Sequence, residues 1–243
     1  MAYISERHCL SLRAPEPAKA MLTQIYEISS PDEARAIAEI GIDHVGVLVG
    51  GGEFPREQRL ARAAEIAAAI PARSKFSALF LTARAEFIVE WARSLKPAIV
   101  HLGAAPELLA PAQVAAIKAA LPSTLIMRSI PVYGGESVRI AQDYAGIADY
   151  LLLDSHRPSD QQIGALGVTH DWSISRRIAE VVSTPVILAG GLGPDNVAEA
   201  IDVVRPAGVD SKTKTDRDGA HTKDLERVRQ FHDAACATRI GLP

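Results

Sequence analysis

The sequence predicts an α/β protein folded as a single (β/α)8 TIM barrel with a short N-terminal extension. Short apolar, β-branched runs alternate regularly with Ala- and Glu-rich stretches of helical spacing. Eight such strand–helix units fit within 243 residues, a length typical of one such barrel. Runs such as 99–102, apart from His101, and 186–189 are apolar throughout, as parallel strands covered on both faces require.

The chain is expected to divide into an extension, residues 1–20, and a barrel, residues 21–243. The extension carries Pro15 and Pro17 and shows no sustained hydrophobic period. The eight strands of the barrel are expected over 21–28, 44–49, 76–81, 98–102, 124–130, 150–153, 185–189 and 207–210.

The first helix is expected between Ser30 and Gly41. Ser30 can accept backbone N–H groups as an N-cap, Pro31 suits the first turn, and a glycine commonly ends a helix. The remaining helices are expected over 59–70, 83–94, 111–121, 136–144, 173–182, 194–203 and 222–237.

Composition excludes several classes of function. A net charge of -3, with Lys and Arg scattered along the chain, disfavours a nucleic-acid partner. The sequence shows neither an apolar run long enough to span a membrane nor a GxGxxG directly after a strand. The two cysteines, Cys9 and Cys236, form no disulfide framework or metal motif, which favours the cytoplasm. We expect no redox cofactor, no metal and no membrane partner.

Two neighbouring loops predict a phosphate site. The seventh strand runs into Gly190 and Gly191, where backbone N–H groups can approach an anion just before a helix. The eighth strand runs into Lys212 and Thr213, which add an ammonium and a hydroxyl group. In a barrel of this type, phosphate is often held by the loops after these two strands. A tight turn and a solvated loop are the alternatives.

Asp154 is the candidate general acid. It directly follows the apolar run 151–153, at the rim of the predicted barrel, where partial burial would raise the pKa of a carboxyl group toward neutrality. A structural cap is the alternative. His101 is expected at the same rim, where a lone histidine is more often a structural hydrogen-bonding group.

Several motifs together resemble the phosphoribosylanthranilate isomerase family of tryptophan biosynthesis. LLLDS at 151–155 is similar to the family's sixth-strand motif, and LAGGLGPDNV at 188–197 to its phosphate-binding segment. GALGVTHDW at 164–172 is similar in spacing to GGTG-x-x-FDW, and Phe54-Pro55-Arg56 resembles Ser-Pro-Arg. Gly208-Val209-Asp210 resembles the family's GVD.

The resemblance implies an Amadori rearrangement, in which an acid protonates the ribose ring oxygen and a base removes the C2 proton. It assigns the acid to Asp154 and places Arg56 against a substrate carboxylate. His101 and Arg128 complete the predicted substrate-binding residues.

The first strand departs from the family pattern. Where the family reads Lys-Ile-Cys-Gly, with the cysteine as base, this chain has Gln24-Ile25-Tyr26-Glu27. Tyr26 is therefore the second predicted catalytic residue, although a reference pKa of about 10 makes a phenol a poor base. Glu27 and His101 are the alternatives. The family's Gln-Leu-His-Gly and Ser-Ser-Gly are also altered, to His101-Leu102-Gly103 and Lys212-Thr213-Lys214.

Three hypotheses follow from these features. The first is an isomerase that converts a phosphorylated ribosylamine into a ketose. The second is a diverged paralogue acting on another phosphorylated sugar or aldehyde, as an isomerase, epimerase or lyase. The third is a barrel that binds a phosphorylated metabolite but catalyses no reaction, because Tyr26 closes the catalytic site that the family uses. In each the partner is a small phosphorylated metabolite, and the protein is a monomer or a homodimer.

Overall fold

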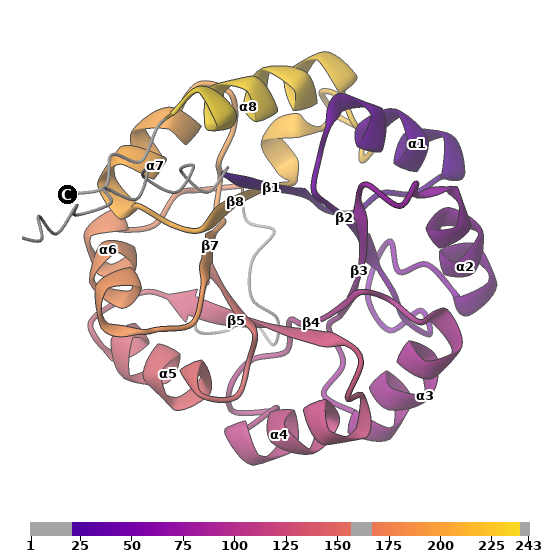
Figure 1. The fold of residues 1–243 in the computed structure, drawn as a ribbon, viewed down its shortest axis with the longest axis horizontal. Coiled ribbons are helices and arrows are strands. Elements are labelled where there is room, and N and C mark those ends of the chain that lie inside the picture. The colour runs from indigo at the N-terminus through magenta and orange to yellow at the C-terminus, as the bar shows by residue number, and fades with distance from the viewer. Residues whose placement is uncertain (1–20, 157–166, 239–243) are drawn as a thin grey trace, which may run out of the picture.

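The structure, a computed structural model, describes residues 21–156 and 167–238, so the expected extension at 1–20 lies outside the described residues. In these ranges, parallel strands close into one barrel in chain order, β1 to β8, and the helices form a ring around it (Figure 1). Strand β1 pairs with both β2 and β8, which completes the closure. The predicted fold class is confirmed.

The strands are short, and each predicted strand is present. Their bounds are β1 Leu22–Ile25, β2 His44–Leu48, β3 Lys75–Phe80, β4 Ile99–Leu102, β5 Leu125–Val132, β6 Tyr150–Ser155, β7 Val186–Leu188 and β8 Gly208–Ser211. The eight α-helices of the described ranges are α1 Pro31–Ile40, α2 Leu60–Ala69, α3 Ala85–Leu95, α4 Pro111–Ala120, α5 Glu136–Ala145, α6 Trp172–Val181, α7 Val197–Val204 and α8 Leu225–Ala237. A short 3-10 helix, Thr213–Thr215, follows β8.

Helix α1 has the ends that its sequence predicts. The Ser30 side chain accepts a hydrogen bond from the Glu33 backbone N–H at 3.2 Å, and Gly41 adopts a left-handed conformation with φ 112°. Helix α7 begins at Val197, three residues after its predicted start. Asn196 is the reason, because its side chain accepts from the Gly193 backbone N–H at 2.9 Å and folds the preceding residues into a turn.

The buried apolar residues form two clusters. The larger one lies between the barrel and the helices and includes Ile37, Phe80, Ile117 and Phe231. The smaller one contains Tyr26, Ile99, Met127, Leu152, Ile187 and Ala189, all on or next to the strands, and fills the barrel interior. Among the described residues, the interior is therefore packed.

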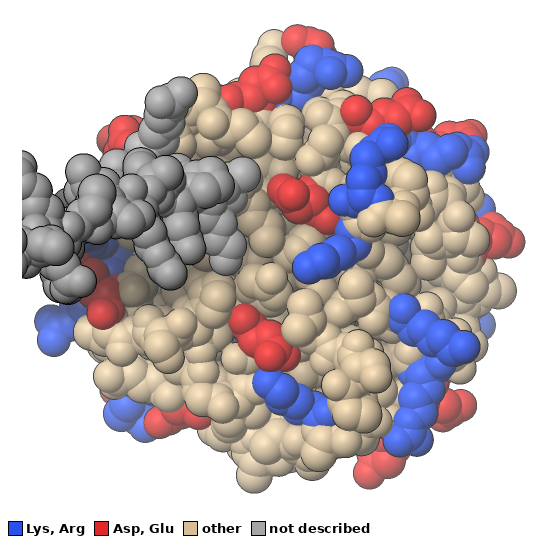
Figure 2. All heavy atoms as spheres, viewed as in Figure 1, with Lys and Arg blue, Asp and Glu red and all other residues tan. Residues whose placement is uncertain are grey.

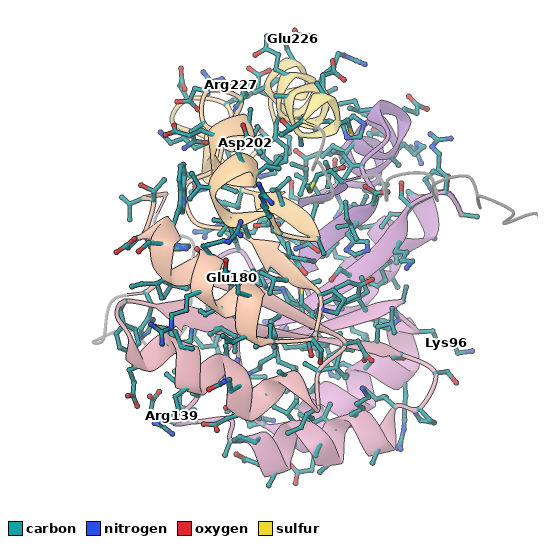
Figure 3. All side chains as sticks on the ribbon, turned by 60° about the vertical axis from the view of Figure 1, so that its left-hand side comes forward. Lys96, Arg139, Glu180, Asp202, Glu226 and Arg227 are labelled. Carbon is teal, nitrogen blue, oxygen red and sulfur yellow. The ribbon has the colours of Figure 1, made fainter. Side chains whose placement is uncertain are left out.

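Charged side chains cover the outside of the helical ring. Figure 3 shows Arg139, Glu180, Asp202, Glu226 and Arg227 pointing away from the barrel. On the face drawn in Figure 2, acidic and basic side chains are interspersed rather than gathered by sign. Within the described ranges, no helix is both long and apolar enough to cross a membrane.

Candidate active site

A cavity of about 120 Å³ opens at the carboxyl ends of the strands, where the barrel fold places its chemistry. Its apolar wall consists of Leu48, Pro55, Leu79, Leu81 and Leu152. Its polar wall consists of Tyr26, Glu27, Arg56, His101, Ser129, Asp154, Asp210 and Lys212. Five of the predicted site residues, contributed by different strands and loops, thus share one cavity.

The four predicted phosphate residues also lie together, around a small hollow that shares Asp154, Asp210 and Lys212 with the main cavity. Gly190 and Gly191 both have positive φ, 85° and 62°. A Cβ atom on Gly191 would lie 2.7 Å from the backbone carbon of Val168, so only glycine fits there. Lys212 and Thr213 form the other side of the hollow.

One neighbouring loop is described only in part. In the segment at 164–172 that resembles the family's loop, residues 164–166 lie outside the described residues. Gly167, the first described residue of this loop, lines the phosphate hollow and has a φ of 65°.

Asp154 and Asp210 form a coupled pair of carboxyl groups. Burial raises the pKa of Asp154 to about 7, against hydrogen bonds that its Oδ1 accepts from the backbone N–H and hydroxyl of Ser155. Burial, and then the charge of Asp154, raise the pKa of Asp210 to about 8. At a pH between these values the pair holds about one proton, as an acid working with a base requires.

Asp210 is not among the residues that the sequence predicts for the site, and it occurs there only within the motif Gly208-Val209-Asp210. The signal was present, because Asp210 follows the apolar residues 207–209 just as Asp154 follows 151–153. Its Oδ1 accepts a hydrogen bond of 3.1 Å from Gln24 Nε2. Gln24 therefore orients the Asp210 carboxyl group from within the barrel.

Tyr26 lies at the floor of the cavity in a chain of hydrogen bonds that runs from Ser77 to Ser129. Its hydroxyl group lies 2.7 Å from Ser77 Oγ and 2.7 Å from His101 Nδ1, and His101 Nε2 lies 2.7 Å from Ser129 Oγ. Burial raises the pKa of Tyr26 well above its ordinary value and lowers that of His101 to about 3. Both groups are uncharged at neutral pH.

These protonation states do not suit the catalytic roles considered for Tyr26 and His101. A phenol that keeps its proton at neutral pH is a weak base, and the nitrogens of His101 are both engaged by neighbours. A Cβ atom on Gly46 would lie 2.1 Å from Tyr26 Cδ1, so the Tyr26 ring occupies space that Gly46 leaves free. We assign Tyr26 and His101 to the cavity floor.

Arg56 lies at the cavity wall, bound by a carboxylate of its own chain. Its Nε and Nη2 donate to Glu27 Oε2 and Oε1 at 2.6 and 3.0 Å. Lys212 Nζ lies 3.3 Å from the same Oε2. Burial would raise the pKa of Glu27, but the Arg56 hydrogen bond and the Lys212 charge outweigh it and lower that pKa. Glu27 is ionised and fully paired, which leaves it no role as the base.

Lys212 connects the Glu27–Arg56 ion pair to a second ion pair, formed by Asp216 and Lys223. Its Nζ lies 3.0 Å from Asp216 Oδ2, and the buried Lys223 Nζ lies 2.5 Å from Asp216 Oδ1. The network fixes Lys212 between the main cavity and the phosphate hollow, both of which it lines. Its ammonium group is therefore held in place before any ligand binds.

Arg128 does not reach the cavity. Its neighbour Ser129 lines the cavity, and successive side chains of a strand point to opposite faces, so Arg128 faces the helices. Its Nη1 donates to the carbonyl oxygens of Leu102 and Ala104 at 2.8 and 2.7 Å, and its guanidinium lies 4.8 Å from the Tyr144 ring centre. The prediction that Arg128 binds substrate does not fit this position.

In the part of the chain that the structure describes, no group of three or more His, Cys, Asp or Glu side chains is placed to hold a metal ion. The assembled cavity offers hydrogen-bond donors for an anion, two carboxyl groups that titrate near neutrality, and an apolar wall. These groups suit proton transfer on a small anionic molecule.

Comparison with known proteins identifies related sequences. The profile of the family described as "N-(5'phosphoribosyl)anthranilate (PRA) isomerase" matches residues 34–234. The N-(5'-phosphoribosyl)anthranilate isomerase of Methanocella arvoryzae is 34% identical over 217 residues, 89% of this chain and 98% of the relative. The enzyme of that name from Afipia carboxidovorans is 34% identical over 222 residues, 90% of each chain.

Solved structures give the same fold. The crystal structure of phosphoribosyl anthranilate isomerase from Thermotoga maritima is similar with a TM-score of 0.73 at 24% identity, over 88% of this chain and 98% of that one. The match of the profile to most of the barrel, together with relatives above 30% identity over nearly their full length, identifies the family. The chain belongs to the N-(5'-phosphoribosyl)anthranilate isomerase family.

Proposed function

We propose that this protein catalyses the isomerisation of a phosphorylated ribosylamine to the corresponding 1-amino-1-deoxyketose, the type of reaction for which its curated relatives are named. The observation that carries the proposal is the Asp154–Asp210 pair, which lies between the phosphate hollow and the apolar wall of the cavity. A phosphate at one end and an N-substituent at the other would place the sugar carbons against these two carboxyl groups.

In the proposed mechanism, Asp154 donates its proton to the ribose ring oxygen, the C1–O bond breaks and the nitrogen lone pair forms a Schiff base. Asp210 then removes the C2 proton, and the electron pair of the C–H bond moves to give an enolamine. Protonation at C1 and loss of the hydroxyl proton at C2 give the ketose. Because only protons and internal electron pairs move, the proposed reaction needs no redox cofactor and no metal ion.

Asp210 is the base that the geometry favours among the candidates. It lines the cavity, is buried, and shares its titration with the proposed acid. Because the pKa of Asp210 is the higher of the two, the reactive form, with the one proton on Asp154 and Asp210 ionised, is the less populated of the two singly protonated forms. Glu27, by contrast, holds both Arg56 and Lys212. Tyr26 and His101 are uncharged and hydrogen-bonded to each other.

The phosphate of the substrate is proposed to bind at Gly190, Gly191, Lys212 and Thr213. Backbone N–H groups in the glycine turn and the Lys212 ammonium group are donors suited to a phosphate. The substrate is thus a small phosphorylated metabolite. We place the protein in the cytoplasm as a monomer or homodimer, in keeping with the free thiol of Cys236 at the surface.

Turnover on defined substrates tests the proposal. Condensing ribose 5-phosphate with a series of arylamines gives N-aryl phosphoribosylamines, and 13C NMR with a label at C2 reports the new ketone carbon. We expect ketose formation with at least one of these amines. Asp154→Asn and Asp210→Asn should each lower kcat by about 10²- to 10⁴-fold, as loss of an acid–base group does.

Asp202→Asn is the matched control, since Asp202 lies on the outer face of α7 and points away from the barrel (Figure 3). It should keep the wild-type rate. No ketose from any amine, with phosphate-dependent binding retained, would favour the second candidate, a non-catalytic binding protein. The observation behind that candidate is the Tyr26 ring, which fills barrel space opposite Gly46.

A further inference from the structure

Gln24 lies inside the barrel between His44 and Asp210 and contacts both. Strand β1 lies between β2 and β8, and Gln24 is in register with His44 on one side and with Asp210 on the other. Residues in register on neighbouring parallel strands point to the same face of a sheet, so the three side chains form one row across the barrel interior. Gln24 is 0% exposed and His44 is 1% exposed, so neither side chain is open to solvent.

The hydrogen bonds of this row fix the orientation of the Gln24 amide. Gln24 Nε2 donates to Asp210 Oδ1 at 3.1 Å, and Gln24 Oε1 lies 3.1 Å from His44 Nδ1. An ionised carboxylate only accepts hydrogen bonds, so it takes the NH2 group of the amide and leaves the amide oxygen facing His44. His44 therefore carries its proton on Nδ1, and this N–H group holds the amide in the orientation that donates to Asp210.

The hydrogen bond from Gln24 acts on the state of the proposed base. The proposed mechanism, on which this inference rests, needs Asp210 ionised while Asp154 holds the proton. Burial, followed by the charge of Asp154, raises the pKa of Asp210, whereas the hydrogen bond from Gln24 lowers it because it stabilises the carboxylate. Without this donor Asp210 would hold its proton more strongly, and the reactive form of the pair would become rarer.

Several other ionisable groups face Asp210, and they come from β1, β6 and the segment after β8. They are Tyr26, Asp154, Lys212 and Lys223. The charge of Asp154 raises the pKa of Asp210, and the charge of Lys223 lowers it. Gln24 differs from these groups because it stabilises the carboxylate by a direct hydrogen bond and carries no charge itself.

His44 is uncharged in the pH range in which the pair titrates. Burial and then the charge of Lys75 lower the pKa of His44 to about 4, against the opposing charge of Asp43. The His44 ring also lies edge-on to the Tyr150 ring, with 5.8 Å between the ring centres. His44 therefore acts on Gln24 through its hydrogen bond rather than through a charge.

We propose that Gln24, with its amide oriented by His44, is a positioning residue that keeps Asp210 available as the base of the reaction. Gln24 is not among the described residues that line the cavity, so it acts through Asp210 rather than on the substrate. His44 acts one step further away, through the Gln24 amide.

Titration of the Asp210 carboxyl group measures this effect without turnover. In protein labelled with 13C at the carboxyl carbon of aspartate side chains, the Asp210 signal is assigned by its absence from Asp210→Asn and is followed from pH 5 to 10. Gln24→Met keeps the length of the side chain and removes the donor. It should raise the titration midpoint of Asp210 by about one pH unit, a tenfold change in its ionisation constant. His44→Phe keeps a ring against Tyr150 and should raise the midpoint by less, and it serves as the test should Gln24→Met fail to fold.

The pH profile of turnover should change in the same direction. Gln24→Met should move the alkaline limb of kcat/KM to higher pH by about one unit and lower the maximum by up to about tenfold, because the shared proton moves from Asp154 to Asp210. Gln24→Lys places a cationic donor at the same position and should move this limb to lower pH. Ser74→Ala is the matched control, since the buried Ser74 hydroxyl donates to the Ile42 carbonyl oxygen just before β2, at 2.7 Å. It should leave the midpoint and both limbs unchanged.

The outcomes separate this inference from the proposed function. An Asp210 midpoint that stays the same or falls in both Gln24→Met and His44→Phe overturns the inference, while ketose formation by the wild-type protein still supports the proposed function. A midpoint that rises together with the alkaline limb supports the positioning role. If the midpoint rises but the wild-type protein forms no ketose from any amine, the proposed function is wrong, and the role of Gln24 in catalysis is wrong with it.

Discussion

Replacement of Asp210 by Asn should stabilise the protein although it lowers kcat. Asp210 is 7% exposed, and burial raises the pKa of its carboxyl group to about 8. In the unfolded chain, where the reference pKa is 3.8, Asp210 loses its proton above about pH 4. In the folded protein Asp210 keeps this proton up to about pH 8. Ionisation of this group opposes folding, so its effect is absent at acidic pH and grows as the pH rises toward about 8.

The size of the effect follows from the pKa difference. A pH of 7 is about three units above the pKa of this carboxyl group in the unfolded chain, whereas the carboxyl group of the folded protein is still mostly protonated at that pH. At about 1.4 kcal/mol per unit, the folded state is penalised by at most about 4 kcal/mol. Asn carries no such charge, and its side-chain oxygen can still accept the hydrogen bond from Gln24. Removal of the carboxyl group should therefore recover part of this penalty.

Urea unfolding of wild-type protein and Asp210→Asn between pH 5 and 9 measures this directly. The free energy of unfolding of the wild type should fall relative to that of the variant as the pH rises, and the variant should be more stable by up to about 4 kcal/mol at pH 7. A variant less stable than the wild type at pH 8, or a difference that does not change with pH, would refute the assignment of a raised pKa to Asp210.

Three further predictions concern the floor of the cavity, the pH dependence of kcat/KM and the phosphate hollow. Tyr26→Phe should lower stability by about 1–3 kcal/mol, since Ser77 and His101 lose a buried partner; a fall in kcat beyond the ~100-fold typical of a lost acid–base group would restore Tyr26 as a catalytic residue. A plot of kcat/KM against pH should be bell-shaped with its maximum between about 7 and 8, because Asp154 and Asp210 are both protonated below this range and both ionised above it; a rate that still rises above pH 9 would contradict the pair. Gly191→Ala should raise KM and weaken binding of inorganic phosphate measured by calorimetry, because its Cβ would collide with the backbone at Val168; unchanged KM would remove Gly191 from the phosphate site.

The fold was predictable from the sequence because its signals are local and repeated. Each strand is a short apolar run, and each helix has its own spacing of apolar residues, so small errors at the ends did not affect the order of elements. The predicted start of α7 is three residues too early. The Asn196 side chain accepts a hydrogen bond from the Gly193 backbone N–H and forms a turn that helical spacing alone does not reveal.

The candidate site was predictable where position along a strand decides it. Asp154 lies near the end of β6, Gly190 and Gly191 follow β7, and the closed barrel brings all three to one end. Side-chain direction was harder. Arg128 is one residue from Ser129, yet the alternation of β5 sends one to the helices and the other to the cavity.

Pairings between distant segments could not be predicted from the sequence. Glu27 and Arg56 are 29 residues apart, and nothing in either segment indicates that a left-handed backbone at both positions joins them. The coupling of Asp210 to Asp154 likewise depends on burial and proximity that exist only in the closed barrel.

Isomerisation in D2O is the decisive measurement for the roles of Asp154 and Asp210. An N-aryl phosphoribosylamine is incubated with the wild-type protein, and the ketose is examined by 1H NMR. The proposed mechanism removes the C2 proton and takes a new proton at C1 from solvent, so the product should carry one deuterium at C1, and neither Asn variant should form it at the wild-type rate. Ketose formed at the wild-type rate by the Asp154→Asn or the Asp210→Asn variant would contradict the proposed proton transfers.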